Sequence, residues 1–181
     1  GWNTVLIERD VLTSGTTWHA AGMITQLGTT PQITKIRKYS VKFYKDLKKI
    51  TGLDTSFRKT GTINIATTKA RYQEYLRQKT MSKLFDLDIE LIDKKKFSSL
   101  YPIAKNKDVL GGLFIPEDGQ ADPDILTKSI AEAAKLEGVK IFEKCKLQKI
   151  LKRNNQIRGV KTNLGIINCE YIVLCAGMWS R

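Results

Sequence analysis

The spacing of apolar residues predicts several helices in this chain. From Pro31 to Ile50 apolar side chains recur every three or four positions, which places them on one helix face and leaves the lysines on the other. Thr30 and Pro31 are typical of a helix start, and Gly52 is typical of a helix end. Further helices are predicted over Lys69–Phe85, over Lys94–Tyr101, and from Pro123, with Asp122 as its cap, to Gly138.

Short apolar runs between these helices predict strands. Thr4–Ile7 is apolar on both faces, which is typical of a buried strand in a parallel sheet, and Tyr171–Leu174 is predicted to be a last buried strand. Val139–Phe142 follows a predicted helix, so the two would form a crossover back into the sheet. Other strands are predicted within Phe57–Thr68, over Ile89–Ile92 and Val109–Ile115, and in an antiparallel meander of Leu147–Leu151, Ile157–Lys161 and Ile166–Asn168. Together these elements predict an α/β fold.

The segment after the first predicted strand has the composition of a nucleotide site. Glu8 ends that strand, and dinucleotide-binding folds have an acid at the end of the second strand that accepts hydrogen bonds from the adenosine ribose. Hydroxyl and small residues follow, which permit close approach of a phosphate or a flat ring: Ser14, Gly15, Thr16, Thr17, Ala20, Ala21 and Gly22. The glycine fingerprint that should precede Glu8 is absent, so we expect a fragment without the first strand.

His19 is the only histidine of the chain and lies inside this segment. An isolated histidine is more often structural than reactive. Its neighbours change this interpretation. Glu8-Arg9, followed by the stretch from Leu12 through Trp18-His19-Ala20-Ala21-Gly22, resembles the flavin domain of the dimethylglycine dehydrogenase and sarcosine dehydrogenase family, within the D-amino-acid-oxidase-like group of flavin amine oxidoreductases.

The resemblance implies a fold, a cofactor and a set of contacts. The fold is an FAD-binding Rossmann-like sheet of the glutathione-reductase type with an inserted α+β substrate domain, incomplete at both ends. His19 would carry FAD covalently through the 8α-methyl group, because a neutral imidazole is a nucleophile near pH 7. The implied cofactor-binding residues are Glu8, Arg9, Ser14, Gly15, Thr16, Thr17, Trp18, His19, Ala20, Ala21, Gly22, Leu147, Ala176, Gly177 and Trp179.

The resemblance also divides the chain into three parts. Residues 1–30 would be the first part of the FAD-binding domain, residues 31–108 the start of the substrate domain, and residues 109–181 the return to the FAD-binding domain. The residues that bind substrate would lie outside the chain, so no catalytic residue is assigned.

The implied function is oxidation of the C–N bond of an N-methyl amino acid, such as dimethylglycine or sarcosine, by hydride transfer to flavin N5. Electron-transfer flavoprotein or oxygen would accept the electrons, and tetrahydrofolate would bind in a C-terminal region beyond this chain. The alternatives are a D-amino-acid or glycine oxidase-like enzyme, a methylaminobutanoate oxidase, and a non-catalytic remnant of a flavin domain.

A formal charge of +13, from 31 basic and 18 acidic residues, adds a basic RNA-binding module as a further alternative. Because the lysines of residues 31–50 lie on an outer helix face and no recognition motif accompanies them, solvation is favoured and no nucleic-acid partner is expected. No apolar stretch approaches the ~20 residues of a membrane span, so membrane insertion is not expected.

Neither the acidic residues nor the cysteines have the spacing of a metal site. Glu117, Asp118, Asp122 and Asp124 do not follow calcium-loop spacing, and a turn with a helix cap explains them. Cys145, Cys169 and Cys175 fit neither a zinc site nor a disulfide framework. A reducing compartment, either the cytoplasm or the mitochondrial matrix, is therefore expected, although the missing N-terminus leaves targeting unreadable.

Overall fold

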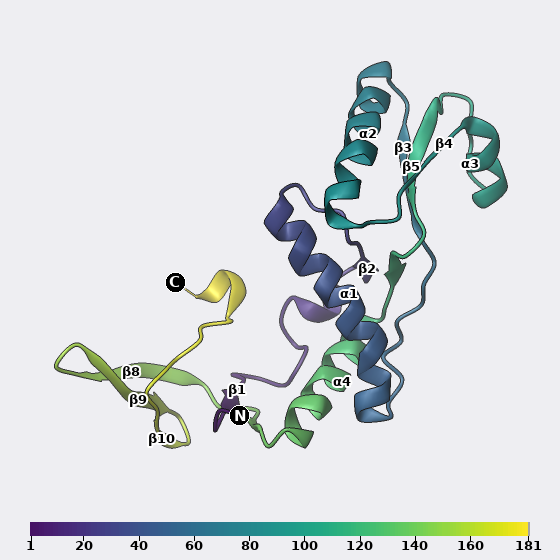
Figure 1. Cartoon of the computed structure of the whole chain (residues 1–181). Helices are drawn as coiled ribbons and strands as arrows, with labels where there is room; N and C mark the ends of the chain where they lie inside the picture. Colours follow the sequence, from purple (N-terminus) through teal and green to yellow (C-terminus); the bar gives the residue numbers. More distant parts are fainter. Residues whose placement is uncertain (181) are drawn as a thin grey trace.

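The computed structural model describes residues 1–180, and the long helix α1 (Pro31–Thr51) runs through its middle (Figure 1). The helix begins where the Thr30 hydroxyl accepts a hydrogen bond from the Ile33 amide at 3.3 Å. It ends at Gly52, whose φ of +73° is the left-handed conformation of a helix C-cap. The predicted start and end of this helix are confirmed.

Helix α4 (Pro123–Leu136) packs against α1. The Asp122 carboxylate caps it by accepting hydrogen bonds from the amides of Asp124 at 2.9 Å and Ile125 at 3.1 Å, which confirms the predicted cap. The buried residues between the two helices are Leu47, Ala121, Leu126 and Ala133, with Phe43, Tyr44, Phe57 and Ile130 around them. This core fixes the N-terminal end of α4 relative to α1.

A second unit is the antiparallel sheet of β3 (Thr62–Ala66), β5 (Gly111–Ile115) and β4 (Glu90–Ile92), in that order. Helix α2 (Lys69–Ser82), continued by the 3-10 turn η2 (Lys83–Phe85), covers one face, and α3 (Lys94–Leu100) covers the other. Side chains alternate along a strand, so Leu113 and Ile115 pack toward α2 and Phe114 packs toward α3. This explains why the central strand is apolar at consecutive positions.

Strand β1 (Val5–Ile7) pairs in parallel with β7 (Lys140–Phe142), which directly follows α4 and confirms the predicted crossover. The prediction that β1 is buried is wrong, since Val5 and Leu6 are 37% and 41% exposed. The reason is that, within residues 1–180, β1 and β7 form a sheet of only two strands.

The predicted strand Tyr171–Leu174 is also wrong. Residues 171–176 are irregular, Val173 is 83% exposed, and the chain then forms the 3-10 turn η3 (Gly177–Trp179). A strand requires a neighbour for its backbone N–H and C=O groups. Among residues 1–180 no strand pairs with this segment.

The predicted meander is confirmed by β8 (Leu147–Arg153), β9 (Gln156–Thr162) and β10 (Gly165–Asn168), ordered β10-β9-β8. Asn154 and Asn155 both have positive φ, as a tight hairpin turn requires.

A pair of two-residue strands that was not predicted, β2 (Met23–Ile24) with β6 (Gly119–Gln120), joins the segment after His19 to the segment before α4. The division at residues 30 and 108 stays a prediction, and β5 lies in the sheet of β3 and β4.

Candidate functional site

Glu8 lies where β1 ends beside β7, and its backbone is fixed on both sides. Its amide donates to the Phe142 carbonyl at 2.9 Å, and its carbonyl accepts from the Cys145 amide at 2.8 Å. One carboxylate oxygen, Oε1, accepts a hydrogen bond from the Asp10 amide at 2.8 Å. The backbone therefore holds Glu8 rigidly and leaves carboxylate acceptor capacity for a ligand hydroxyl.

Arg9, Gly15 and Trp179 come together although they lie at opposite ends of the chain. The Arg9 guanidinium carbon is 5.8 Å from the centroid of the Trp179 ring, within the range of a cation–π contact. A Cβ placed on Gly15 would lie 3.9 Å from the same ring. Trp179 is 51% exposed, so this contact forms an open surface of a cation, an aromatic ring and a small residue.

His19 is exposed at the end of the 3-10 turn η1 (Thr17–His19). The Trp18 ring lies against it, with ring centroids 3.8 Å apart and planes tilted by 32°. Trp18 itself is 61% exposed, and among residues 1–180 no hydrogen bond or ion pair involves the imidazole. The ring is therefore accessible to a reaction partner, and His19 is not a buried structural histidine.

The small and hydroxyl residues around η1 leave open space. Ser14, Gly15, Thr16, Ala20 and Ala21 are exposed, and Thr17 is half-buried. Ala176 and Gly177 are also exposed, and a Cβ on Gly177 would meet no atom within 4 Å. Leu147, by contrast, lies half-buried at the start of β8 opposite Thr162, in the meander that extends away from α1 and α4 in Figure 1.

Three contacts that hold this segment were not predicted from the sequence. The Thr13 hydroxyl donates to Asp124 Oδ1, and the Leu12 amide donates to Glu143 Oε1 at 2.6 Å. At the other end, the Gly22 carbonyl accepts from the Ala121 amide at 2.9 Å. Thr13–Asp124 and Leu12–Glu143 link residues more than 100 positions apart, so no local sequence signal reveals them.

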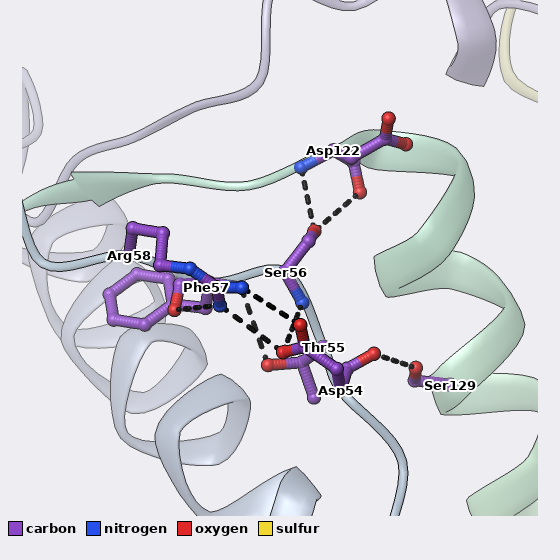
Figure 2. Close-up of polar contacts among 7 residues, drawn as sticks. All are labelled: Asp54, Thr55, Ser56, Phe57, Arg58, Asp122 and Ser129. Atoms are coloured by element: carbon purple, nitrogen blue, oxygen red, sulfur yellow. Dashed lines mark hydrogen bonds and ion pairs between the residues drawn. The ribbon is translucent and has the colours of Figure 1, made fainter.

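The loop before β3 is tied to the N-terminus of α4 (Figure 2). The Asp122 amide donates to the Ser56 hydroxyl at 2.8 Å, and the Ser129 hydroxyl donates to the Asp54 carbonyl at 3.2 Å. The Arg58 guanidinium contacts both Asp54 carboxylate oxygens, at 3.1 and 2.8 Å. Because these hydrogen bonds favour the ionised form, they lower the pKa of Asp54 to about 2.

The remaining acidic residues have structural partners. Glu117 pairs with Lys45 at 2.5 Å and Lys59 at 2.8 Å, and these hydrogen bonds lower its pKa to about 2. Asp118 is fully buried and accepts hydrogen bonds from the Gln26 amide at 2.9 Å and the Thr62 hydroxyl at 2.6 Å. The turn-and-cap interpretation of the acidic cluster is supported by these contacts.

These features fit a flavin nucleotide. The chain presents a carboxylate at a strand end, exposed glycine, alanine and hydroxyl residues, and an imidazole with no competing partner within the described residues. Such groups suit a ribose, a phosphate-bearing chain and a flat ring, respectively. The fold and this surface are consistent with a nucleotide-cofactor protein of the α/β class.

The chain belongs to the FAD-dependent oxidoreductase family, because the family model of that description (DAO) matches residues 1–181. It is 35% identical over 99% of its length to 4-methylaminobutanoate oxidase (formaldehyde-forming) of Paenarthrobacter nicotinovorans. It is 33% identical over 99% of its length to mitochondrial dimethylglycine dehydrogenase of Rattus norvegicus. A third relative, at 32% identity over 99% of the chain, is the mitochondrial pyruvate dehydrogenase phosphatase regulatory subunit of Mus musculus.

The fold is shared with solved structures. The crystal structure of L-proline dehydrogenase from P. horikoshii matches 92% of this chain with a TM-score of 0.86 and 28% sequence identity. The chain covers 44% of that structure and about a fifth (21–22%) of the three relatives above. The predicted family and FAD-binding fold are confirmed, whereas the site residues stay predictions. No helix within residues 1–180 is long and apolar enough to cross a membrane.

Proposed function

We propose that the protein containing this chain is an FAD-dependent enzyme that oxidises the C–N bond of an N-methyl amino acid, such as dimethylglycine or sarcosine. The observation that carries the proposal is the exposed His19 imidazole, free of hydrogen bonds within the described residues and lying against Trp18, in a chain of this family. The relatives named for N-methylated substrates support the substrate class.

The chain's own residues would bind and orient the cofactor. When bound, FAD would accept the electron pair that the C–N oxidation releases. His19 would hold FAD covalently through an imidazole nitrogen, because no described side chain competes for that nitrogen. Glu8 would accept hydrogen bonds from the ribose hydroxyls, and Gly15, Gly177 and the Arg9–Trp179 pair would border the phosphate-bearing part. The electron acceptor would be electron-transfer flavoprotein or oxygen. Any tetrahydrofolate site would lie outside residues 1–181.

Two other functions have a specific observation in their favour. The 35% identity to 4-methylaminobutanoate oxidase favours a longer N-methylamino acid as substrate. The 32% identity to a phosphatase regulatory subunit favours a flavin-domain remnant with a regulatory role. The lysines of α1 at positions 35, 42, 48 and 49 are exposed, and Lys45 pairs with Glu117, which is consistent with solvation and surface ion pairs rather than an RNA-binding site.

The test uses the full-length protein. After acid precipitation the yellow colour should stay with the polypeptide, and a tryptic peptide containing Trp18-His19-Ala20 should carry the mass of FAD. His19→Ala should make the flavin releasable while the melting temperature stays within the range of a surface substitution, and Lys42→Ala on the outer face of α1 is the control. Flavin wholly in the supernatant of the wild type would contradict the covalent role of His19.

Substrate assays separate the three candidates. Turnover of dimethylglycine or sarcosine would support the proposed substrate class, and faster turnover of 4-methylaminobutanoate would favour the longer substrate. Bound flavin without turnover of any N-methylamino acid would favour the regulatory remnant.

A further inference from the structure

We propose that Asp124 is a positioning residue for the Trp18–His19 turn, acting through the hydroxyl of Thr13. This inference rests on the proposed function for its effect on flavin attachment, but the contact itself belongs to the fold. The segment from Thr13 to Gly22 is hydrogen-bonded at both ends to residues at the beginning of α4. At the first end the Thr13 hydroxyl donates to Asp124 Oδ1, and at the second the Gly22 carbonyl accepts from the Ala121 amide.

The backbone of Thr13 indicates that this end needs the side-chain contact. Thr13 has a φ of 75°, a left-handed conformation that β-branched residues rarely adopt. Such a conformation persists only where neighbouring contacts hold it. The Thr13 hydroxyl makes one hydrogen bond within residues 1–180, to Asp124, and it joins two segments that lie 111 positions apart.

Asp124 is itself fixed on the helix. Its second carboxylate oxygen pairs with Lys128 at 2.6 Å, one turn further along α4. The pKa of Asp124 is lowered by hydrogen bonds from Lys128 and Thr13, which keeps the carboxylate ionised as an acceptor. The helix therefore presents a directed, charged acceptor to Thr13, and a charge-assisted hydrogen bond of this kind is stronger than a neutral one.

The contact affects the imidazole because η1 lies beside α4, between the two attachment points. Within the described residues, the His19 ring has no hydrogen bond of its own, and its neighbour Trp18 is mostly exposed. The orientation of His19 is therefore set by the backbone of the turn, and the turn is set by its two ends. The first end depends on side chains, through the Thr13–Asp124 contact and, one residue earlier, the hydrogen bond from the Leu12 amide to Glu143 Oε1.

The test compares Thr13→Val with Thr13→Ser in the full-length protein. Valine keeps the branched shape and removes the hydroxyl, whereas serine keeps the hydroxyl. Hydrogen exchange followed by mass spectrometry should show exchange in residues 14–21 about tenfold or more faster in Thr13→Val, the change expected for loss of one charge-assisted hydrogen bond. Thr13→Ser should stay near the wild type, and α1 should be unaffected in both.

Flavin attachment is the second readout. The rate at which FAD becomes acid-stable on the apoprotein should fall about tenfold in Thr13→Val, with rescue by serine, while the melting temperature of the core barely changes. Asp124→Ala should behave like Thr13→Val, and Lys128→Met should have a smaller effect because it leaves the Thr13 contact in place. Equal exchange in the valine and serine variants would overturn the proposal. If the wild type holds no covalent flavin, the proposed role of His19 fails, and the exchange comparison still decides the role of Asp124.

Discussion

Gly22→Ala is expected to destabilise the protein far more than the same change at Gly52. Both glycines have nearly the same backbone conformation, with φ of +75° and +73°. Alanine in this left-handed region costs about 1–2 kcal/mol at either position. The two sites differ in space, because a Cβ at Gly22 would lie 2.2 Å from the Ala121 carbonyl oxygen, whereas at Gly52 nothing lies within 4 Å.

The collision at Gly22 adds its own cost. To reach contact distance the two backbones must separate by roughly 1 Å, which breaks the hydrogen bond from the Ala121 amide to the Gly22 carbonyl and strains the β2–β6 pair. Each lost hydrogen bond contributes about 0.5–1.5 kcal/mol. We therefore expect a total loss of about 2–4 kcal/mol for Gly22→Ala and about 1–2 kcal/mol for Gly52→Ala.

The measurement is the free energy of unfolding of the full-length protein, from denaturant titration and calorimetry of the transition that includes this domain. Gly22→Ala should lower the melting temperature by about 5–10 °C more than Gly52→Ala. Gly138→Ala, at a φ of +87° with nothing within 4 Å, is a second control and should match Gly52→Ala. Equal losses at Gly22 and Gly52 would show that the close approach to Ala121 does not hold the Gly22 end of the segment from Thr13 to Gly22.

Two further predictions concern charge. Glu8→Gln should weaken non-covalent FAD binding by about tenfold or more, because a charged hydrogen bond is lost; the assay is dialysis in a His19→Ala background. The control is the exposed Glu170→Gln, which should leave FAD binding unchanged. Equal FAD retention in the two variants would show that Glu8 is an ordinary surface acid. Lys45 and Lys59 lower the pKa of Glu117 from 4.5 to about 2, so its contribution to stability is present above about pH 4.5 and is lost as the pH falls toward 2. Glu117→Gln should have a lower free energy of unfolding than the wild type at pH 6, and the two values should converge near pH 2. The difference should be smaller in high salt, since the carboxylate is partly exposed. A difference that does not depend on pH would contradict this role.

Local chemical signals made the helices predictable. Thr30, Pro31 and Gly52 define the ends of α1, and Asp122 with Pro123 defines the start of α4, because each signal acts within a few residues. The burial of β1 and the formation of a strand at Tyr171–Leu174 depend on neighbouring strands, and apolar composition alone does not supply them. The sequence therefore predicted the helices and strands better than it predicted their burial and strand pairing.

The same distinction between local and long-range signals applies to the candidate site. His19 and its neighbours were recognised because the residues that make the resemblance are nearly contiguous in the chain. Thr13, Asp124 and Glu143 were missed as a group because their contacts span more than 100 positions. Asp124 looked like part of a helix start, which it also is, and only the folded chain brings it to the segment before His19.

The arrangement around η1 bears on how the turn could serve a bound cofactor. Within the described residues Trp18 is 61% exposed, so its ring is available to pack against a cofactor. The turn that presents it is nevertheless anchored at both ends, to Asp124 and to Ala121. The proposed covalent attachment of a ring requires an imidazole held in one orientation, and a turn anchored at both ends meets that requirement. The anchoring is therefore what the proposed attachment needs, and the exchange behaviour of Thr13→Val measures how much of it serves His19.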